Sequence, residues 1–283
     1  FFTLSLGMGI ICNYASYLQP DEDIVTASVA TVALNEFAEV ILAGTSVIPI
    51  SYAFLGPEGI KGSIGLAFMA LPNVFTTMAG RRIFGAVWFF LLFFAGFTSA
   101  IAMYNYLVAL LEEELGLQRK KGALLIFVLY LIVGAPIAAE GIMTGEANLI
   151  YFTEVDNWIG NYLLIVLGLL EVITLAWLVR DDGLVEMNKG GLWHVPKWFY
   201  KLFHQFLTPI CIIVFLGIFT RDYWIAGNFK ITPSYINGIE YMAPWVNAAR
   251  LVVVVVLIIG FIQTYRAIKR KYKDEIETNK ANA

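Results

Sequence analysis

The sequence predicts an all-α, polytopic membrane helical bundle. Of the 283 residues, 59% are hydrophobic and 14% are charged, and the mean hydropathy is strongly positive. Water-soluble domains of this length do not show such a composition. The apolar residues also gather in runs of about 20 residues, the length that crosses the hydrocarbon of a bilayer as a helix. A helix suits these runs because it satisfies its own backbone hydrogen bonds where water is absent.

Six apolar runs are predicted to span the membrane, and a shorter helical piece at 10–17 precedes them. The six runs are 24–55, 83–114, 121–141, 157–179, 199–220 and 246–265. We expect 1–283 to form a single transmembrane domain. The connection 57–82 is half apolar and contains the breaks Gly56-Pro57 and Leu71-Pro72. These breaks favour two short helices that form an extracellular lid, although a plain surface loop fits the pattern equally well.

The first residue, Phe1, lies in an apolar segment that is too short to cross a bilayer. No basic region precedes the segment and no small-residue cleavage site follows it, so we do not interpret it as a signal peptide. We expect Phe1 to lie part-way along a helix, with the N-terminal half of the protein missing from this sequence.

Basic residues predict the orientation of the bundle. They are dense in the connections around 119–121 and 180–201 and in the tail, where Arg266, Lys269 and Arg270 belong to one cluster. Connections rich in Lys and Arg face the cytoplasm. The sequence therefore predicts a multi-pass protein of the plasma or inner cell membrane with a cytoplasmic tail at 266–283.

Several residues with potential metal or catalytic chemistry lack suitable neighbours. Cys12 and Cys211 lie in apolar runs, where thiols pack as small hydrophobic side chains more often than they form disulfides or metal sites. His194 and His204 have no acidic or thiol neighbours at ligand spacing. The sequence shows no nucleophile paired with a base, no metal cluster and no phosphate-binding loop, so we do not expect an enzyme.

Polar residues at membrane depth are costly and usually face a cavity. The first such place is the segment 1–9, where Gly7 and Gly9 lie in an apolar stretch. Each glycine weakens a helix by about 1 kcal/mol relative to alanine, so the backbone can leave the helical path here. Exposed carbonyl and amide groups can then hold a cation or a carboxylate. Close packing of the glycines against a neighbouring helix is the alternative.

The second place is the run 24–55. Its polar residues recur at three-, four- and seven-residue steps and form one stripe on a regular helix, with Glu36 turned away: Ser28, Thr31, Asn35, Glu39 and Ser46. The Asn35 carboxamide oxygen can ligate a small hard cation, and Glu39 can supply a negative charge or exchange a proton. Hydrogen bonding between helices is the alternative interpretation.

The third place is 94–103. Ala95, Thr98, Ser99 and Ala102 share a small, hydroxyl-bearing face in an otherwise bulky helix. The two hydroxyl oxygens, together with the Ala95 carbonyl oxygen if the helix bends locally, would give part of a sodium site. A face for close helix packing explains the pattern equally well.

Long blocks of this sequence resemble the neurotransmitter:sodium symporter family, especially its bacterial, leucine-transporter-like amino-acid transporters. The blocks are 1–9, Leu34-Asn35-Glu36-Phe37-Ala38-Glu39-Val40-Ile41-Leu42, 88–99 and Asn188-Lys189-Gly190-Gly191. The resemblance implies a discontinuous-helix, inverted-repeat transporter fold, truncated to the second half of helix six through helix twelve. It also implies sodium-coupled symport of a neutral, hydrophobic or aromatic amino acid into the cell by alternating access, with two Na+ ions.

The resemblance further implies roles for individual residues. Thr3 and Asn35 would ligate one sodium ion, and Ala95, Thr98 and Ser99 a second, each site being completed by the missing half. The wall around the substrate side chain would comprise Phe2, Thr3, Ser5, Leu6, Met8, Ser99, Ala102 and Met103. Met8 stands where a leucine-handling member has phenylalanine, and its flexible thioether suits several side-chain shapes.

Charged residues outside these sites acquire roles in the same way. Glu39 resembles the carboxylate that replaces chloride in chloride-independent members. Glu113 and Tyr17 resemble the acid of the cytoplasmic gate and its aromatic support, and Asp156 resembles the acid of the outer gate. The implied partners are the amino-acid substrate, sodium, the lipid bilayer and the missing N-terminal half, with a homodimer possible and no nucleic acid.

Two other functions remain open on the sequence. A channel would show a repeated filter sequence and a symmetric assembly, which this asymmetric chain does not offer. A structural or regulatory membrane subunit that does not transport suits a chain without the N-terminal half.

Overall fold

The computed structural model describes residues 5–57, 71–145, 149–233 and 242–273. The regular elements within these ranges are helices, and none is a strand. In chain order they are α1 (Ile10–Ala15), α2 (Ile24–Glu36), η1 (Phe37–Ala43), α3 (Gly44–Leu55), α5 (Leu71–Thr77), α6 (Arg81–Leu115), α7 (Arg119–Thr144), α8 (Ile150–Val155), η4 (Asp156–Leu163), α9 (Leu164–Ile173), η5 (Thr174–Val179), α10 (Asp181–Met187), α11 (Lys197–Tyr200), η6 (Lys201–Leu207), α12 (Thr208–Ile225) and α13 (Ala243–Lys271).

Six continuous helices in the described ranges are long and apolar enough to cross a membrane, which confirms the predicted all-α membrane bundle. They are Ile24–Ala53, Arg81–Leu115, Arg119–Thr144, Ile150–Val179, Lys197–Ile225 and Ala243–Lys271. Most extend beyond the predicted apolar runs. The fourth span begins at Ile150, seven residues before its predicted start at 157. It can include the charged Glu154 because that side chain is buried inside the protein, at 1% exposure.

The connection 57–82 is described in part. Helix α5 is one short helix within it, whereas the remainder of the predicted lid, 58–70, lies outside the described residues. A two-helix extracellular lid therefore stays a prediction.

Short π-helical turns, labelled η, interrupt three of the described spans. In a π turn each N–H bonds to the carbonyl five residues earlier, which widens the helix locally and changes the angle between successive side chains. Because η1 lies between Asn35 and Ser46, the regular α spacing that placed Ser46 on the stripe of Asn35 does not apply across this segment.

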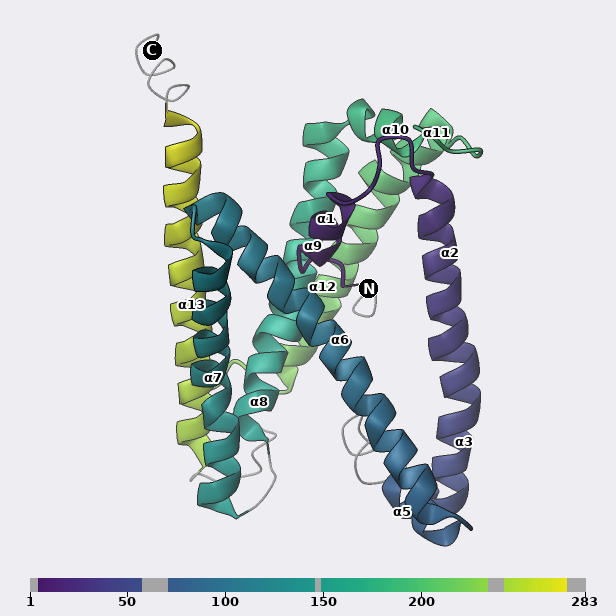
Figure 1. Ribbon diagram of the computed structural model, residues 1–283, viewed down its shortest axis with the longest axis vertical. Coiled ribbons are helices and arrows are strands. Elements are labelled where there is room, and N and C mark those ends of the chain that lie inside the picture. The colour runs from purple at the N-terminus through teal and green to yellow at the C-terminus, as the bar shows by residue number, and fades with distance from the viewer. Residues whose placement is uncertain (1–4, 58–70, 146–148, 234–241, 274–283) are drawn as a thin grey trace. The chain divides into compact units, whose positions relative to one another are not determined.

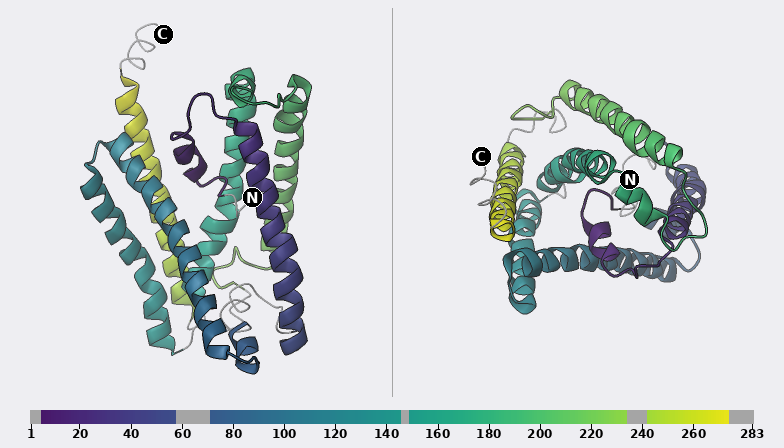
Figure 2. Two further views of the ribbon diagram at one scale, coloured as in Figure 1. Left: turned by 45° about the vertical axis from the view of Figure 1, so that its right-hand side comes forward. Right: turned by 90° about the horizontal axis from the view of Figure 1, so that it is seen from above.

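The chain divides into two compact units. The first comprises Phe1–Ser5, Tyr14–Met103 and Leu184–Val195, and the second comprises Leu6–Asn13, Tyr104–Gly183 and Pro196–Ala283. Within the first unit, α3 packs against α5. Within the second, α13 runs alongside α8 and α7 (Figure 1), and α12 packs against α9, the green and teal helices of Figure 2.

Candidate functional site

The segment Ser5–Gly9 leaves the helical path. Ser5, Gly7 and Gly9 all have positive φ angles, of 55°, 77° and 72°. Helix α1 begins only at Ile10. The predicted opening of the backbone is therefore confirmed, and the regular helical bonds resume at the Gly9 carbonyl, which accepts from the Asn13 N–H.

Within the second unit, residues of α9 and of the C-terminal part of α6 hold the Leu6–Gly9 part of this segment. The Gly7 N–H donates a hydrogen bond to Glu171 Oε2 on α9 at 3.0 Å. A methyl group added at Gly7 would lie 3.0 Å from the Leu164 carbonyl oxygen, and one added at Gly9 would overlap the Tyr106 ring on α6. Both interpretations of the glycines thus hold together, because the opened backbone also packs closely against its neighbours.

An opened segment of this kind can bind small ligands through its backbone. Peptide N–H groups outside a helix attract carboxylates, and peptide carbonyls attract cations. The Glu171 carboxylate accepts the hydrogen bond of the Gly7 N–H and adds a negative charge beside the segment. Phe2 and Thr3, which belong to the predicted substrate wall, lie outside the described residues.

Asn35 and Glu39 lie next to each other on the first span. Asn35 is the next-to-last residue of α2 and Glu39 lies in η1. The Asn35 amide Nδ2 donates to Glu39 Oε2 at 3.4 Å. Because the amide nitrogen turns toward the carboxylate, the amide oxygen remains an acceptor that can ligate a cation.

The third candidate face lies on α6, which continues as one helix through Ala95 and Ser99. The Thr98 hydroxyl donates to the Phe94 carbonyl at 2.9 Å and to the Ala95 carbonyl at 3.1 Å. The helix therefore has no local break at Ala95 that would free its carbonyl oxygen. The Thr98 hydroxyl oxygen keeps its lone pairs for a ligand.

The profile of the Sodium:neurotransmitter symporter family matches residues 1–270. The chain belongs to this family. The uncharacterized sodium-dependent transporter MJ1319 of Methanocaldococcus jannaschii is 34% identical over 82% of this chain and 48% of its own length. YhdH of Bacillus subtilis, also an uncharacterized sodium-dependent transporter, is 29% identical over 77% of this chain and 49% of its own length.

A eukaryotic relative carries a more specific name. The sodium-dependent nutrient amino acid transporter 1 of Drosophila virilis is 24% identical over 87% of this chain and 38% of its own length. The chain spans about half the length, or less, of these relatives. As a symporter-family chain whose described residues include six helices long and apolar enough to span a membrane, it is an integral membrane protein.

The other predicted substrate-wall residues of this symporter-family chain lie on two segments. Ser5, Leu6 and Met8 belong to the opened segment, and Ser99, Ala102 and Met103 follow one another along α6. Leu6 and Met103 are each 38% exposed within the protein. Since Leu6 and Met103 fall in different units, their grouping around one substrate stays a prediction.

The predicted gate residues lie just after α1, in the last turn of α6 and inside the span Ile150–Val179. Tyr17 is 66% exposed and its ring lies 6.4 Å from that of Tyr14. Glu113 is exposed in the last turn of α6. Asp156 opens η4, where the Asn161 amide donates to its carboxylate at 3.2 Å.

Sequence reasoning missed four charged residues that the structure places in specific contacts: Glu140, Glu154, Glu171 and Arg250. A signal was available, because each lies in or beside an apolar run, where an ionisable residue usually has a partner or a function. Their partners are backbone groups or distant side chains, which no single helix pattern reveals.

Proposed function

We propose that the complete protein is a sodium-coupled symporter that moves a neutral, hydrophobic or aromatic amino acid into the cell by alternating access. The observation that carries this proposal is the opened backbone at Ser5–Gly9 in a sodium:neurotransmitter symporter chain. Peptide groups released from a helix can recognise the charged groups that every amino acid shares. The side chain would meet the largely apolar wall, where Met8 adapts to large shapes.

Two sodium sites complete the proposal. Thr3 and Asn35 would ligate one ion. Thr98 and Ser99 would ligate another, joined by the Ala95 carbonyl oxygen if α6 bends there when the ion binds. The remaining oxygens would be supplied by a part of the protein outside this sequence. The Asn35 amide oxygen and the Thr98 hydroxyl oxygen are suited to this role because both are uncharged oxygen ligands. Glu39, beside Asn35, would supply the fixed negative charge that replaces chloride.

Each sodium ion that carries one charge across the whole membrane potential releases about 2.3 kcal/mol per 100 mV. This energy would drive the amino acid inward while Glu113 and Tyr17 close one side and Asp156 the other. Segments rich in Lys and Arg face the cytoplasm, so the basic residues around 266–273 support a C-terminus on the cytoplasmic side of the cell membrane.

Uptake of radiolabelled leucine, phenylalanine and tryptophan into proteoliposomes tests the proposal. The full-length protein would be compared with Asn35→Ala and Thr98→Ala, each of which removes one sodium ligand. We expect either substitution to raise the sodium concentration for half-maximal uptake about tenfold, which corresponds to about 1.4 kcal/mol of lost binding free energy, because each removes one oxygen ligand of the ion.

Thr174→Ala is the matched control, since the Thr174 hydroxyl also donates to its own helix, at the Leu170 carbonyl. Sodium dependence should be unchanged in this variant. If Asn35→Ala and Thr98→Ala also leave sodium dependence unchanged, the assignment is wrong. Absence of any uptake by the full-length protein would favour a structural or regulatory subunit.

A further inference from the structure

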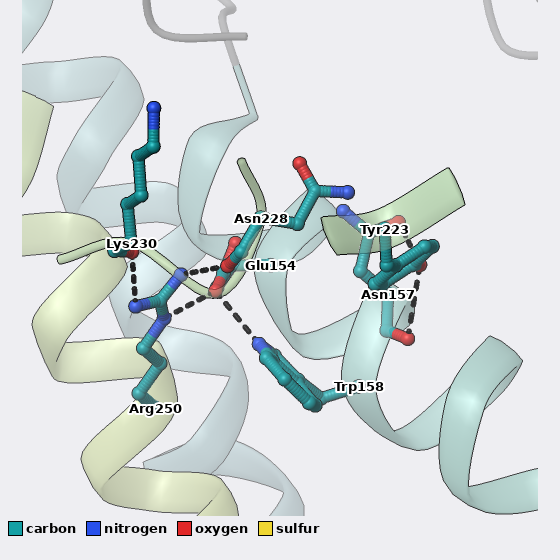
Figure 3. Close-up of polar contacts among 7 residues, drawn as sticks. All are labelled: Glu154, Asn157, Trp158, Tyr223, Asn228, Lys230 and Arg250. Carbon is teal, nitrogen blue, oxygen red and sulfur yellow. Dashed lines mark hydrogen bonds and ion pairs between the residues drawn. The ribbon is translucent and has the colours of Figure 1, made fainter. Parts of the chain in front are cut away.

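A buried ion pair joins α13 to the helix that carries Asp156 (Figure 3). Arg250 Nε donates to Glu154 Oε1 at 2.5 Å. The Glu154 side chain is 1% exposed and that of Arg250 is 23% exposed. A carboxylate buried to this degree needs its cation, because removing one partner leaves an uncompensated charge.

The guanidinium of Arg250 uses its remaining nitrogens on the chain that follows α12. Arg250 Nη1 donates to the Lys230 carbonyl at 2.6 Å, and Nη2 donates to the Asn228 carbonyl at 2.7 Å (Figure 3). The planar fork therefore fixes three groups at once, which a lysine ammonium cannot reproduce in the same geometry.

Further contacts secure the same face of the helix. Trp158 Nε1 donates to Glu154 Oε1 at 2.8 Å. The Tyr223 hydroxyl on α12 donates to Asn157 Oδ1 at 3.1 Å. The Trp158 ring also packs edge-on against the rings of Tyr223 and Phe229. Trp158 contacts Glu154, and Tyr223 contacts both Asn157 and Trp158, so these contacts together hold one side of the helix.

Asp156 lies on another face of this helix. It opens η4, two residues after the buried Glu154. Its side chain is exposed, and its carboxylate lies over Gly160, where an added methyl group would overlap it. Asn161 Nδ2 donates to the same carboxylate at 3.2 Å. The network thus holds one face of the helix while Asp156 projects from another.

We propose that Arg250 and Glu154 are positioning residues for Asp156. Their ion pair sets the rotation of α8 and η4 about the helix axis, and this rotation sets the direction in which the Asp156 carboxylate projects. The inference rests on the proposed gate role of Asp156. It gives α13 a part in gating, although the predicted ion and substrate sites include no residue of that helix.

A thiol at position 156 tests the positioning directly. In the full-length protein, the rate at which Asp156→Cys reacts with a membrane-impermeant methanethiosulfonate reagent would be measured with Arg250 intact and with Arg250→Lys. The protein with Asp156 retained gives the background rate. We expect Arg250→Lys to change the rate about fivefold or more, as for two coupled sites.

Two controls separate positioning from general loosening. Arg266→Lys makes the same change at an exposed residue of α13, and it should leave the rate at position 156 unchanged. The thiol of Ile142→Cys, on α7, should react at the same rate with and without Arg250→Lys. An unchanged rate at position 156, or an equal change at both thiols, would overturn the inference.

Transport supplies an independent readout. In uptake assays, the effects of Arg250→Lys and Asp156→Asn on KM should be non-additive, whereas Arg250→Lys and Asn35→Ala should be additive. Additive effects of Arg250→Lys and Asp156→Asn would contradict the inference. If Arg250→Lys does not fold, Trp158→Phe, which keeps an aromatic ring but removes the indole N–H that donates to Glu154, should move the thiol rate in the same direction. If Arg250→Lys changes the thiol rate at position 156 but the full-length protein shows no sodium-dependent uptake, the proposed function is wrong and the positioning role of Arg250 and Glu154 still holds.

Discussion

Glu140 on α7 caps the first turn of α8 by accepting a hydrogen bond from the backbone N–H of Tyr151 at 2.9 Å. Its second carboxylate oxygen accepts from the Ile150 N–H at 2.7 Å. Glu140 is 1% exposed. The first N–H groups of a helix have no partner within the helix, and the positive end of the helix dipole favours a negative charge there. One buried side chain of α7 therefore fixes the start of the next span at α8.

We predict that Glu140→Ala destabilises the full-length protein by about 2 kcal/mol, because two buried N–H groups lose a charged acceptor. Thermal unfolding in detergent, followed by tryptophan fluorescence, measures the change. Glu140→Gln should cost less, since its amide oxygen can still accept one of the bonds. The control is Glu186→Ala, which removes a carboxylate that pairs with Lys189 at the exposed surface. Equal melting temperatures for Glu140→Ala and Glu186→Ala would refute the capping role.

The helices themselves were predictable from the sequence because each membrane span contains a long apolar run. The opening at Gly7 and Gly9 was predictable as well, since glycine weakens a helix wherever it occurs. Both features depend on residues close together in the chain. The π turn at η1 was not predictable, because nothing in Phe37–Ala43 distinguishes it from an ordinary apolar helix.

The long-range polar contacts were also beyond the sequence. Glu154 and Arg250 are 96 residues apart, and Gly7 and Glu171 are 164 residues apart. Each charged residue could be recognised as costly in an apolar run, but its partner depends on how the helices pack. The proposed sodium sites are a third case, because their residues were recognised through family resemblance and their convergence stays a prediction.

Glu171 supports the opened segment through the Gly7 N–H, which donates to it at 3.0 Å. We predict that Glu171→Ala lowers sodium-dependent uptake by the full-length protein about tenfold, because an N–H left without its acceptor costs about 1–3 kcal/mol and loosens the segment. Glu171→Gln should retain more activity, since its carbonyl oxygen can accept the same bond. Uptake rates normalised to protein at the membrane are the measurement.

Glu186→Ala is the control for Glu171, because it removes an exposed carboxylate outside the spans, where it pairs with Lys189. Uptake should change less than twofold, as expected for a surface substitution within about 0.5 kcal/mol of neutral. If Glu171→Ala behaves like Glu186→Ala, the contact with Gly7 has no part in transport.

Gly190 approaches the backbone of Asp21 so closely that an added methyl group would overlap the Asp21 carbonyl. Its φ angle is 76°. We predict that Gly190→Ala destabilises the full-length protein by about 2 kcal/mol or more, from backbone strain and the overlap together. Gly145→Ala separates these causes, because Gly145 has a φ of 69° and open space around its Cα. A melting temperature for Gly190→Ala no lower than that for Gly145→Ala would show that the close approach costs nothing.

Asp23 caps α2, and its contacts predict a dependence on acid. The Thr26 backbone N–H and the Thr26 hydroxyl, helped by the Leu192 N–H, hold the pKa of Asp23 below its ordinary value of 3.8. The folded protein therefore binds this proton less readily than the unfolded chain does, so the capping contribution is complete above pH about 4 and is lost as the pH falls through the lower folded pKa. In melting experiments between pH 5 and pH 2, we expect the full-length protein to be more stable than Asp23→Asn at pH 5 and the difference to shrink at the acid end. Glu22→Gln is the control, because it removes a neighbouring charge outside the cap. The difference in stability between the unsubstituted protein and Glu22→Gln should not shrink between pH 5 and pH 2. If the difference between the unsubstituted protein and Asp23→Asn also stays constant over this range, ionised Asp23 does not stabilise the start of α2.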